Sequence, residues 1–232
     1  MEMFLLKSKN RITENREAYN IHHCYDREKY NNPISNYFKN LVSVKDCEIK
    51  PNMGFLPHIH KNMELITVAI KGTLVQTNNL GETHHITPGK VQVMSAGSGV
   101  SHFEYNKSTD TTLNCIQFCI IPTINYTKPK SEILSIEKNI KGFQKITPTE
   151  TISTNNTKIL ENLHLYYGSL DSDTTKTYHL KNNKKGILIL NISGNIEVNG
   201  EVLENRDTLV LRKISELTIK SKNTSIFFLF EI

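Results

Sequence analysis

The chain has 232 residues, of which 38% are hydrophobic and 22% are charged, and its formal net charge is +5. A chain of this length can bury a proper core, either as one large domain or as two small ones. No apolar run approaches the roughly 20 residues that span a bilayer, and the lysines neither form one run nor alternate with aromatic residues. The composition therefore argues against an integral membrane protein and against a nucleic-acid-binding surface.

The N-terminal part of the chain carries two short features. MEMFLLKSKNR has a small apolar patch that contains Glu2 and lacks the small residues of a cleavage site, so it predicts no signal peptide and a cytoplasmic protein. Further along, IHHCYD places His22, His23 and Cys24 side by side. No second ligand pair accompanies them, so we expect no metal site in this cluster.

From residue 64 onward the sequence reads as strands separated by turns. ELITVAIKGTLVQT at 64–77 is rich in β-branched residues and is divided by Gly72, and NNLGE at 78–82 is typical of a hairpin tip. KVQVM at 90–94 follows a Pro-Gly turn, and TTLNCIQFCII at 111–121 has the composition of another strand. This half of the chain is therefore predicted to be a β-structure.

None of the four cysteines belongs to a C-x-x-C motif, so the sequence contains neither a zinc ribbon nor a thioredoxin-type site. Cys115 and Cys119 lie four residues apart on one predicted strand. Free cysteines are among the most buried side chains, so we expect both of them to be core residues.

Residues 122–160 differ in character from the rest, because they contain three of the seven prolines and many Lys, Thr and Asn residues. SEILSIEKNIKGF, at 131–143, is typical of a short helix or an irregular connection. Strand-like segments then resume: ENLHLYYGSL, KTYHL, GILILNISGNIEVNGEVL, DTLVLRK, SELTIKS and TSIFFLFEI. The chain thus has two β-rich halves joined by a different kind of segment.

The two halves share a weak internal repeat. ITVAIKGTLVQTNNLGE and LILNISGNIEVNGEV both have a strand, a glycine, a second strand and a turn glycine. Many short strands at close spacing predict an all-β fold of sandwiches or small barrels. We therefore expect two antiparallel, jelly-roll-like β-barrels, at residues 1–122 and 146–232, joined by a linker at 123–145.

Two histidines stand just before the strand at 64–71, in GFLPHIHKNME. His58 and His60 are two residues apart, so on a strand they point to the same face, roughly 6–7 Å apart along it. The same parity continues through the apolar residues Ile66, Val68 and Ile70. The pattern predicts that both histidines share a face with the interior of the barrel.

A second pair, His102 and Glu104, follows the glycine-rich SAGSGV at 95–100 and also has the i, i+2 spacing of one strand face. Two such pairs on facing strands can place three imidazoles and one carboxylate around a single point. This donor set suits a first-row divalent metal such as Fe(II), Mn, Ni, Cu or Zn. Four protein ligands of an octahedron leave two positions for water, O₂ or substrate.

These motifs resemble the pirin family of the cupin superfamily. The resemblance covers about residues 54–106 and consists of P-H-x-H, then M-E before the strand, the strand–Gly turn, PG followed by VQVMSAGSG, and H-x-E. It implies a bicupin in which the N-terminal barrel holds the metal and the C-terminal barrel has lost its ligands. Consistent with this, residues 145–232 contain only His164 and His179, neither of them in an H-x-H motif.

The resemblance implies that His58, His60, His102 and Glu104 are the metal ligands and that the metal is commonly iron. Some bacterial members resemble quercetin 2,3-dioxygenases, which open a flavonol with O₂ and release carbon monoxide. Glu104 would then take the proton of the 3-hydroxyl group, with a small aromatic substrate and O₂ as partners. Two alternatives stay open: a non-enzymatic, metal-dependent regulatory or binding protein with a protein partner, and an isomerase or sugar-binding cupin.

Other polar residues near the motifs receive different expectations. Glu64 lies roughly 13 Å beyond His60 along a straight strand, so we expect it to support the site or a hairpin and not to be a ligand. His84 and His85 are adjacent, so at most one points inward, and both are expected at the surface or rim. Phe103 stands where the family usually has a small residue, and its position predicts that it faces away from the metal.

Overall fold

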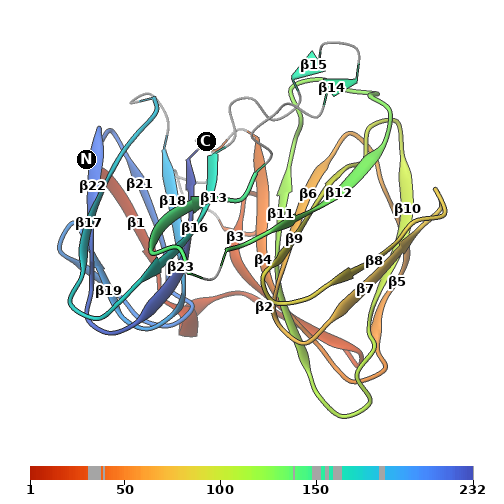
Figure 1. Cartoon of the computed structure of the whole chain (residues 1–232), viewed down its shortest axis with the longest axis horizontal. Helices are drawn as coiled ribbons and strands as arrows, with labels where there is room; N and C mark the ends of the chain where they lie inside the picture. The colour runs from red at the N-terminus through yellow and green to blue at the C-terminus, as the bar shows by residue number, and fades with distance from the viewer. Residues whose placement is uncertain are drawn as a thin grey trace.

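The computed structural model describes residues 1–30, 38, 40–137, 139–147, 153–154, 157–158, 164–182 and 186–231. Apart from the 3-10 turn Ser8–Asn10, the regular elements of these residues are all β-strands. Four larger sheets form two lobes that lie side by side (Figure 1). Every strand pair is antiparallel, and each lobe consists of two facing sheets that do not close into one continuous barrel within the described residues.

The N-terminal lobe consists of a seven-stranded and a four-stranded sheet. In spatial order the larger sheet contains β12 (Lys130–Ser135), β9 (Lys90–Ser95), β6 (Glu64–Lys71), β11 (Leu113–Ile120), β4 (Leu41–Ile49), β3 (Tyr19–Asp26) and β2 (Thr13–Asn15). The smaller sheet contains β5 (Gly54–His60), β10 (Val100–Asn106), β7 (Leu74–Asn78) and β8 (Thr83–Ile86).

The C-terminal lobe is built from a six-stranded and a four-stranded sheet. The larger one contains β1 (Glu2–Leu6), β21 (Thr208–Arg212), β18 (Ile187–Ser193), β23 (Ser225–Glu231), β16 (His164–Leu170) and β13 (Gly142–Lys145). The smaller one contains β17 (Thr175–His179), β22 (Glu216–Ser221), β19 (Ile196–Val198) and β20 (Glu201–Leu203). Two short strands, β14 (Ser153–Thr154) and β15 (Thr157–Lys158), form a separate two-stranded sheet.

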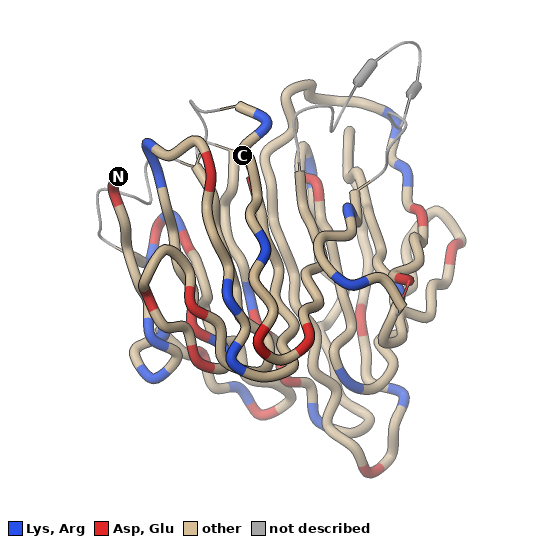
Figure 2. The backbone as a smooth tube through the Cα atoms, turned by 60° about the vertical axis from the view of Figure 1, so that its left-hand side comes forward, with Lys and Arg blue, Asp and Glu red and all other residues tan. Residues whose placement is uncertain are grey.

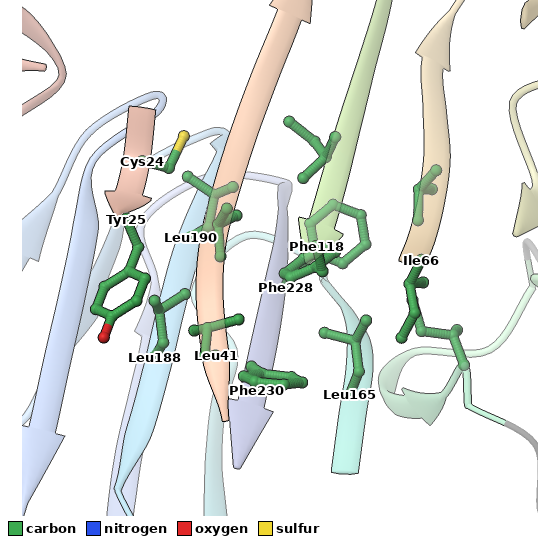
Figure 3. Close-up of a cluster of buried hydrophobic side chains, with 14 of the residues drawn as sticks. Cys24, Tyr25, Leu41, Ile66, Phe118, Leu165, Leu188, Leu190, Phe228 and Phe230 are labelled. Carbon is green, nitrogen blue, oxygen red and sulfur yellow. The ribbon is translucent and has the colours of Figure 1, made fainter. Parts of the chain in front are cut away.

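The lobes are joined by a common hydrophobic core that lies between their two large sheets (Figure 3). Phe118 of β11 packs against Phe228 and Phe230 of β23, with ring centroids 5.7 and 5.9 Å apart. Side chains alternate along a strand, so Phe227 and Leu229 of β23 point instead into the interior of the C-terminal lobe. That interior is filled with apolar side chains, whereas the N-terminal lobe contains a cavity.

The predicted parity of the histidine strand is wrong in one respect. The chain turns at Asn62, whose φ is +49°, and passes from the four-stranded to the seven-stranded sheet. Parity therefore does not carry over from β5 to β6. Ile66 and Val68 pack in the core between the lobes, and Leu65 and Thr67 face the interior of the N-terminal lobe.

The segment between the two halves contains strands where a helix or an irregular connection was expected. β12 pairs with β9 at the edge of the seven-stranded sheet, and β13 pairs with β16 in the C-terminal lobe. At the other end of the chain, β1 pairs with β21 and so belongs to a C-terminal sheet, where its red ribbon lies among blue strands in Figure 1. The predicted domain boundaries at residues 122 and 145 stay a prediction. The two strands between them, β12 and β13, belong to sheets of the two lobes.

The cysteines and the charged residues differ in where they lie in the fold. All four cysteines are free and buried, which confirms that Cys115 and Cys119 are core residues. Lys and Arg residues are interspersed with Asp and Glu residues over both lobes (Figure 2). Among the described residues, no helix has the length and apolar character needed to cross a membrane.

Candidate metal centre

Three histidines converge on one face of the four-stranded sheet. β5 and β10 pair so that His58 lies directly opposite His102 and His60 lies opposite Val100. The ring centroids are 4.4 Å apart for His58 and His102, and 4.9 Å apart for each of the other two pairs. One nitrogen of each ring lies within 4.8 Å of the others. The predicted common face of the histidine motifs is thereby confirmed.

A β-bulge shapes the strand that carries the first two histidines. His58 pairs with His102 but Phe55 pairs with Glu104, so Leu56 and Pro57 together oppose the single residue Phe103. Proline lacks an N–H group and suits a bulge on an edge strand, and β5 is the edge of its sheet. The extra residue brings Phe55 to the same side as His58, with ring centroids 6.5 Å apart.

The bulge also sets the tautomer of His58. Its Nδ1 lies 2.8 Å from the carbonyl oxygen of Leu56. A carbonyl can only accept a hydrogen bond, so Nδ1 carries the proton and donates it. The lone pair is then on Nε2, which points toward His102, and a ligand histidine needs this kind of fixed tautomer.

The environment keeps the other two imidazoles neutral. Burial lowers the pKa of His60 to about 4, and the neighbouring His102, His58 and Lys45 act in the same direction. Burial and the proximity of His58 likewise lower the pKa of His102 to about 4. A neutral imidazole has a lone pair available for a metal, so neither ring has to lose a proton to bind one at neutral pH.

Glu104 reaches the same cavity but is held by amide groups. Nε2 of Gln76 donates to its Oε1 at 3.0 Å, and Nε2 of Gln117 donates to its Oε2 at 2.9 Å. Gln92 donates in turn to Gln76, and its Nε2 also donates to Oγ of Ser131 at 3.1 Å. The carboxylate is nearly inaccessible to solvent and is fixed by side chains from both sheets.

The donor set fits a first-row divalent metal. Nε2 of His58 and Nε2 of His102 are 2.8 Å apart. Two nitrogens that each lie about 2.1 Å from one metal, at right angles, are about 3 Å apart. Nδ1 of His102 is buried without a hydrogen-bond partner in the described part of the chain. The polar contact that the ring makes there is the one between its Nε2 and Nε2 of His58.

A cavity of about 760 Å³ contains this cluster. It is lined by the three histidines, Glu104, Gln117 and Lys45, and also by residues that include Tyr19 and Phe55. The rings of Tyr19 and Phe55 are 4.4 Å apart and form an aromatic wall. A volume of this size, mostly apolar with a few polar groups, is typical of a small-molecule site.

All four residues that the motifs selected therefore lie in one cavity, whereas the other polar candidates lie elsewhere. Glu64 is on the opposite face of the seven-stranded sheet, where its Oε1 accepts a hydrogen bond from Oγ of Ser95 at 2.8 Å. His85 is exposed, and Nε2 of His84 is 3.6 Å from Oε2 of Glu82. Phe103 is partly exposed on the outer face of β10.

The histidine-rich stretch near the N-terminus does not line the cavity. His22 contacts Oγ1 of Thr13 at 2.9 Å, and Nε2 of His23 contacts Oε1 of Glu14 at 2.8 Å. Cys24 lies in the core between the lobes. These side chains support the β2–β3 edge and the contact between the lobes.

Sequence reasoning missed three residues of the site: Lys45 and Gln117, which line the cavity, and Gln76, which donates a hydrogen bond to Glu104. Each is a polar residue that directly follows an apolar residue on a strand, in VSVKDC, TLVQTN and CIQFC. A polar side chain at an inward-facing position of a strand is the signal that could have selected them. Which positions face inward becomes known only from the pairing.

Comparison with known proteins identifies the family. The Pirin family model matches residues 9–120, and the model of the quercetinase C-terminal cupin domain matches residues 149–232. A pirin-like protein of Caulobacter vibrioides is 32% identical over 199 residues, which covers 85% of each chain. The chain belongs to the pirin family. The predicted family and the all-β bicupin fold are thereby confirmed.

Other pirins and relatives match the chain over nearly its full length. Quercetin 2,3-dioxygenase of Escherichia coli K12 is 26% identical over 230 residues, which covers 99% of this chain and 98% of that one. The crystal structure of the bacterial pirin YhhW from Escherichia coli in complex with nickel(II) has a TM-score of 0.88 at 25% identity, covering 100% of this chain and 99% of that one. The histidine cluster and this nickel-bound pirin both indicate a divalent-metal site.

Proposed function

We propose that His58, His60, His102 and Glu104 bind a divalent metal and that the protein is a dioxygenase for quercetin-type flavonols or related aromatic enediols. The observation that carries the proposal is the convergence of three imidazoles in a cavity that also contains Glu104. Fe(II) is the metal we propose first. Nickel is the leading alternative because the similar pirin contains nickel(II), and Mn, Cu and Zn suit the same donors.

Each part of the cavity has a role in this reaction. A bound metal would supply Lewis acidity, which lowers the pKa of a coordinated hydroxyl group. Glu104 accepts the proton of the 3-hydroxyl group, while Gln76 and Gln117 keep its carboxylate oriented. Tyr19 and Phe55 pack against the aromatic rings of the substrate. The heterocycle is opened with O₂, and carbon monoxide is released.

The test is reconstitution of metal-free protein with Fe(II), Mn(II), Ni(II) or Cu(II) in separate samples. With quercetin as substrate, we expect oxygen consumption and release of carbon monoxide in equal amounts with at least one metal. Glu104→Gln should retain the cavity and lose turnover, and Glu137→Gln, at an exposed position, is the matched control. Absence of turnover with all four metals would contradict the flavonol reaction.

A second candidate is a metal-dependent binding protein without turnover. It is favoured by exposed apolar side chains on the edge strand next to the cavity, where Leu56 is 84% exposed and Ile59 is 75% exposed. A stable, stoichiometric protein partner together with absent turnover would support it. A cytoplasmic location is expected for either function.

A further inference from the structure

A lysine points into the metal cavity from the opposite wall. Lys45 is on β4, where it pairs with His23 of β3 on one side and with Gln117 of β11 on the other. Its strand neighbours of the same parity, Ser43 and Cys47, are buried, so Lys45 faces the interior of the N-terminal lobe. It lines the same cavity as the histidine cluster and Glu104.

The ammonium group of Lys45 makes neither an ion pair nor a side-chain hydrogen bond in the described part of the chain. Its two neighbours across the strands are already engaged, because Gln117 donates to Glu104 at 2.9 Å and Nε2 of His23 contacts Glu14 at 2.8 Å. A partly buried ammonium that no other side chain engages is free to bind an anion that enters the cavity from outside.

The charged side chains of the cavity support the same conclusion. Arg16 and Lys45 are its two cationic residues, and Glu17 and Glu104 are its two acidic residues, so their formal charges cancel. A divalent metal therefore leaves a net charge of about +2. A flavonol bound as a monoanion compensates only half of this charge. A ligand with an ionised oxygen at the metal and a second anionic group compensates all of it.

We propose that Lys45 binds a carboxylate on the ligand, so that the cavity selects small aromatic hydroxy-carboxylates over uncharged analogues. The aromatic ring lies between the histidine cluster and the lysine, against the apolar Leu65 and Cys119 of the cavity wall. The flexible lysine stem lets the ammonium reach a carboxylate at several distances from the metal. This proposal rests on the metal site of the proposed function but not on turnover of a flavonol.

The test compares a carboxylate ligand with its uncharged methyl ester. 3,4-Dihydroxybenzoate and its methyl ester are titrated by calorimetry, without O₂, into nickel(II)-loaded full-length protein. We expect the carboxylate to bind at least about 10-fold more tightly than the ester, because a charge-assisted hydrogen bond in a partly buried site is worth that much. Equal affinity for the two ligands would overturn the proposal without the need for any variant.

Variants at Lys45 test whether this residue causes the preference for the carboxylate over the ester. Lys45→Met should remove the difference between the two ligands, and Lys45→Arg should retain most of it. Lys71→Met changes an exposed lysine at the end of β6 and is the matched control, for which no change is expected. Metal content, measured by elemental analysis, should be equal in all four proteins. A preference that persists in Lys45→Met would overturn the proposal.

The experiment separates this inference from the proposed dioxygenase. A carboxylate preference that depends on Lys45, in a protein that consumes no oxygen with quercetin, supports the lysine site and contradicts flavonol oxidation. Turnover of quercetin together with equal binding of the two ligands supports flavonol oxidation and contradicts the lysine site.

Discussion

Glu64 is fully buried on the face of the seven-stranded sheet that packs against the C-terminal lobe. One of its oxygens accepts a hydrogen bond from Ser95, and the other has no partner in the described residues. Burial raises the pKa of the carboxyl group to about 8, so it is protonated in the folded protein at pH 7. The unfolded chain loses this proton near the ordinary value of 4.5.

This difference predicts a pH dependence of stability. Between pH 4.5 and 8 the folded state retains a proton that the unfolded state has lost, so the free energy of unfolding falls as the pH rises, by at most about 1.4 kcal/mol per pH unit. Glu64→Gln should therefore raise the melting temperature at pH 8.5 and change it little at pH 5. Glu137→Gln, at an exposed position, should have no effect at either pH. The same shift at both pH values for Glu64→Gln would contradict the assignment.

The glutamines around Glu104 lead to a second prediction at this scale. Gln117→Met keeps the length of the side chain and removes the amide that donates to both oxygens of Glu104. Loss of such a supporting hydrogen bond weakens metal binding by about 10- to 100-fold. Competition with a chelator would measure the change. An affinity equal to that of the unchanged protein would show that Gln117 does not orient the carboxylate.

Residue types alone revealed the histidine and glutamate motifs, because imidazole and carboxylate at i, i+2 spacing have few other uses on a buried strand face. Lys45 and Gln117 belong to no such motif. Their importance comes from the pairing of β4 with β11. In this pairing Lys45 lies opposite Gln117, which is 72 residues further along the chain. The raised pKa of Glu64 also depends on packing against the other lobe, which a sequence does not display.

At the scale of elements, the site depends on the close approach of β5 and β10. Gly54 lies at the start of β5 opposite Tyr105. A Cβ atom at Gly54 would be 2.6 Å from the Cα of Tyr105 and closer still to the carbonyl oxygen of Glu104. Only glycine fits there, because the obstacle is the backbone of the strand that carries His102 and Glu104.

Gly54→Ala is therefore expected to separate the two strands, lower the melting temperature and reduce the bound metal. Thermal unfolding and elemental analysis of the same preparation would measure both effects. Gly81→Asn is the matched control, since Gly81 has a φ of +82° that asparagine tolerates, and a Cβ there meets nothing within 4 Å. Normal metal content in Gly54→Ala would show that the strands can separate without loss of the site.

Strand prediction succeeded where apolar residues alternate or form a run, as in β6, β11 and β23. It failed at β12, because SEILSIE contains residues that also favour a helix and only the open edge of β9 makes it a strand. The parity error at β5 and β6 has a similar cause. A single residue with positive φ, Asn62, moves the chain from one sheet to the other. The hydrophobic pattern of the sequence gives no sign of that change.

For the whole molecule, the two lobes share structure in two ways. β1 pairs with β21 in a C-terminal sheet, although the strands are about 200 residues apart in sequence. The core between the large sheets contains Phe118 of the N-terminal lobe and Phe228 of the C-terminal lobe (Figure 3). Unfolding of either lobe would expose this core, so we expect both lobes to unfold together.

Phe118→Ala tests this coupling. The side chain is fully buried, and its loss should lower the free energy of unfolding by about 3–5 kcal/mol. Denaturation followed by tyrosine fluorescence and by circular dichroism should give a single, coincident transition at lower denaturant for the variant. Two separate transitions would contradict a shared core.

We propose that the N-terminal lobe holds one divalent metal through His58, His60, His102 and Glu104. The most direct measurement is elemental analysis of protein purified without a histidine tag, with His58→Ala and His102→Ala prepared in parallel. We expect close to one metal ion per chain in the unchanged protein and loss of that metal in both variants. Equal metal content in all three proteins would contradict the site.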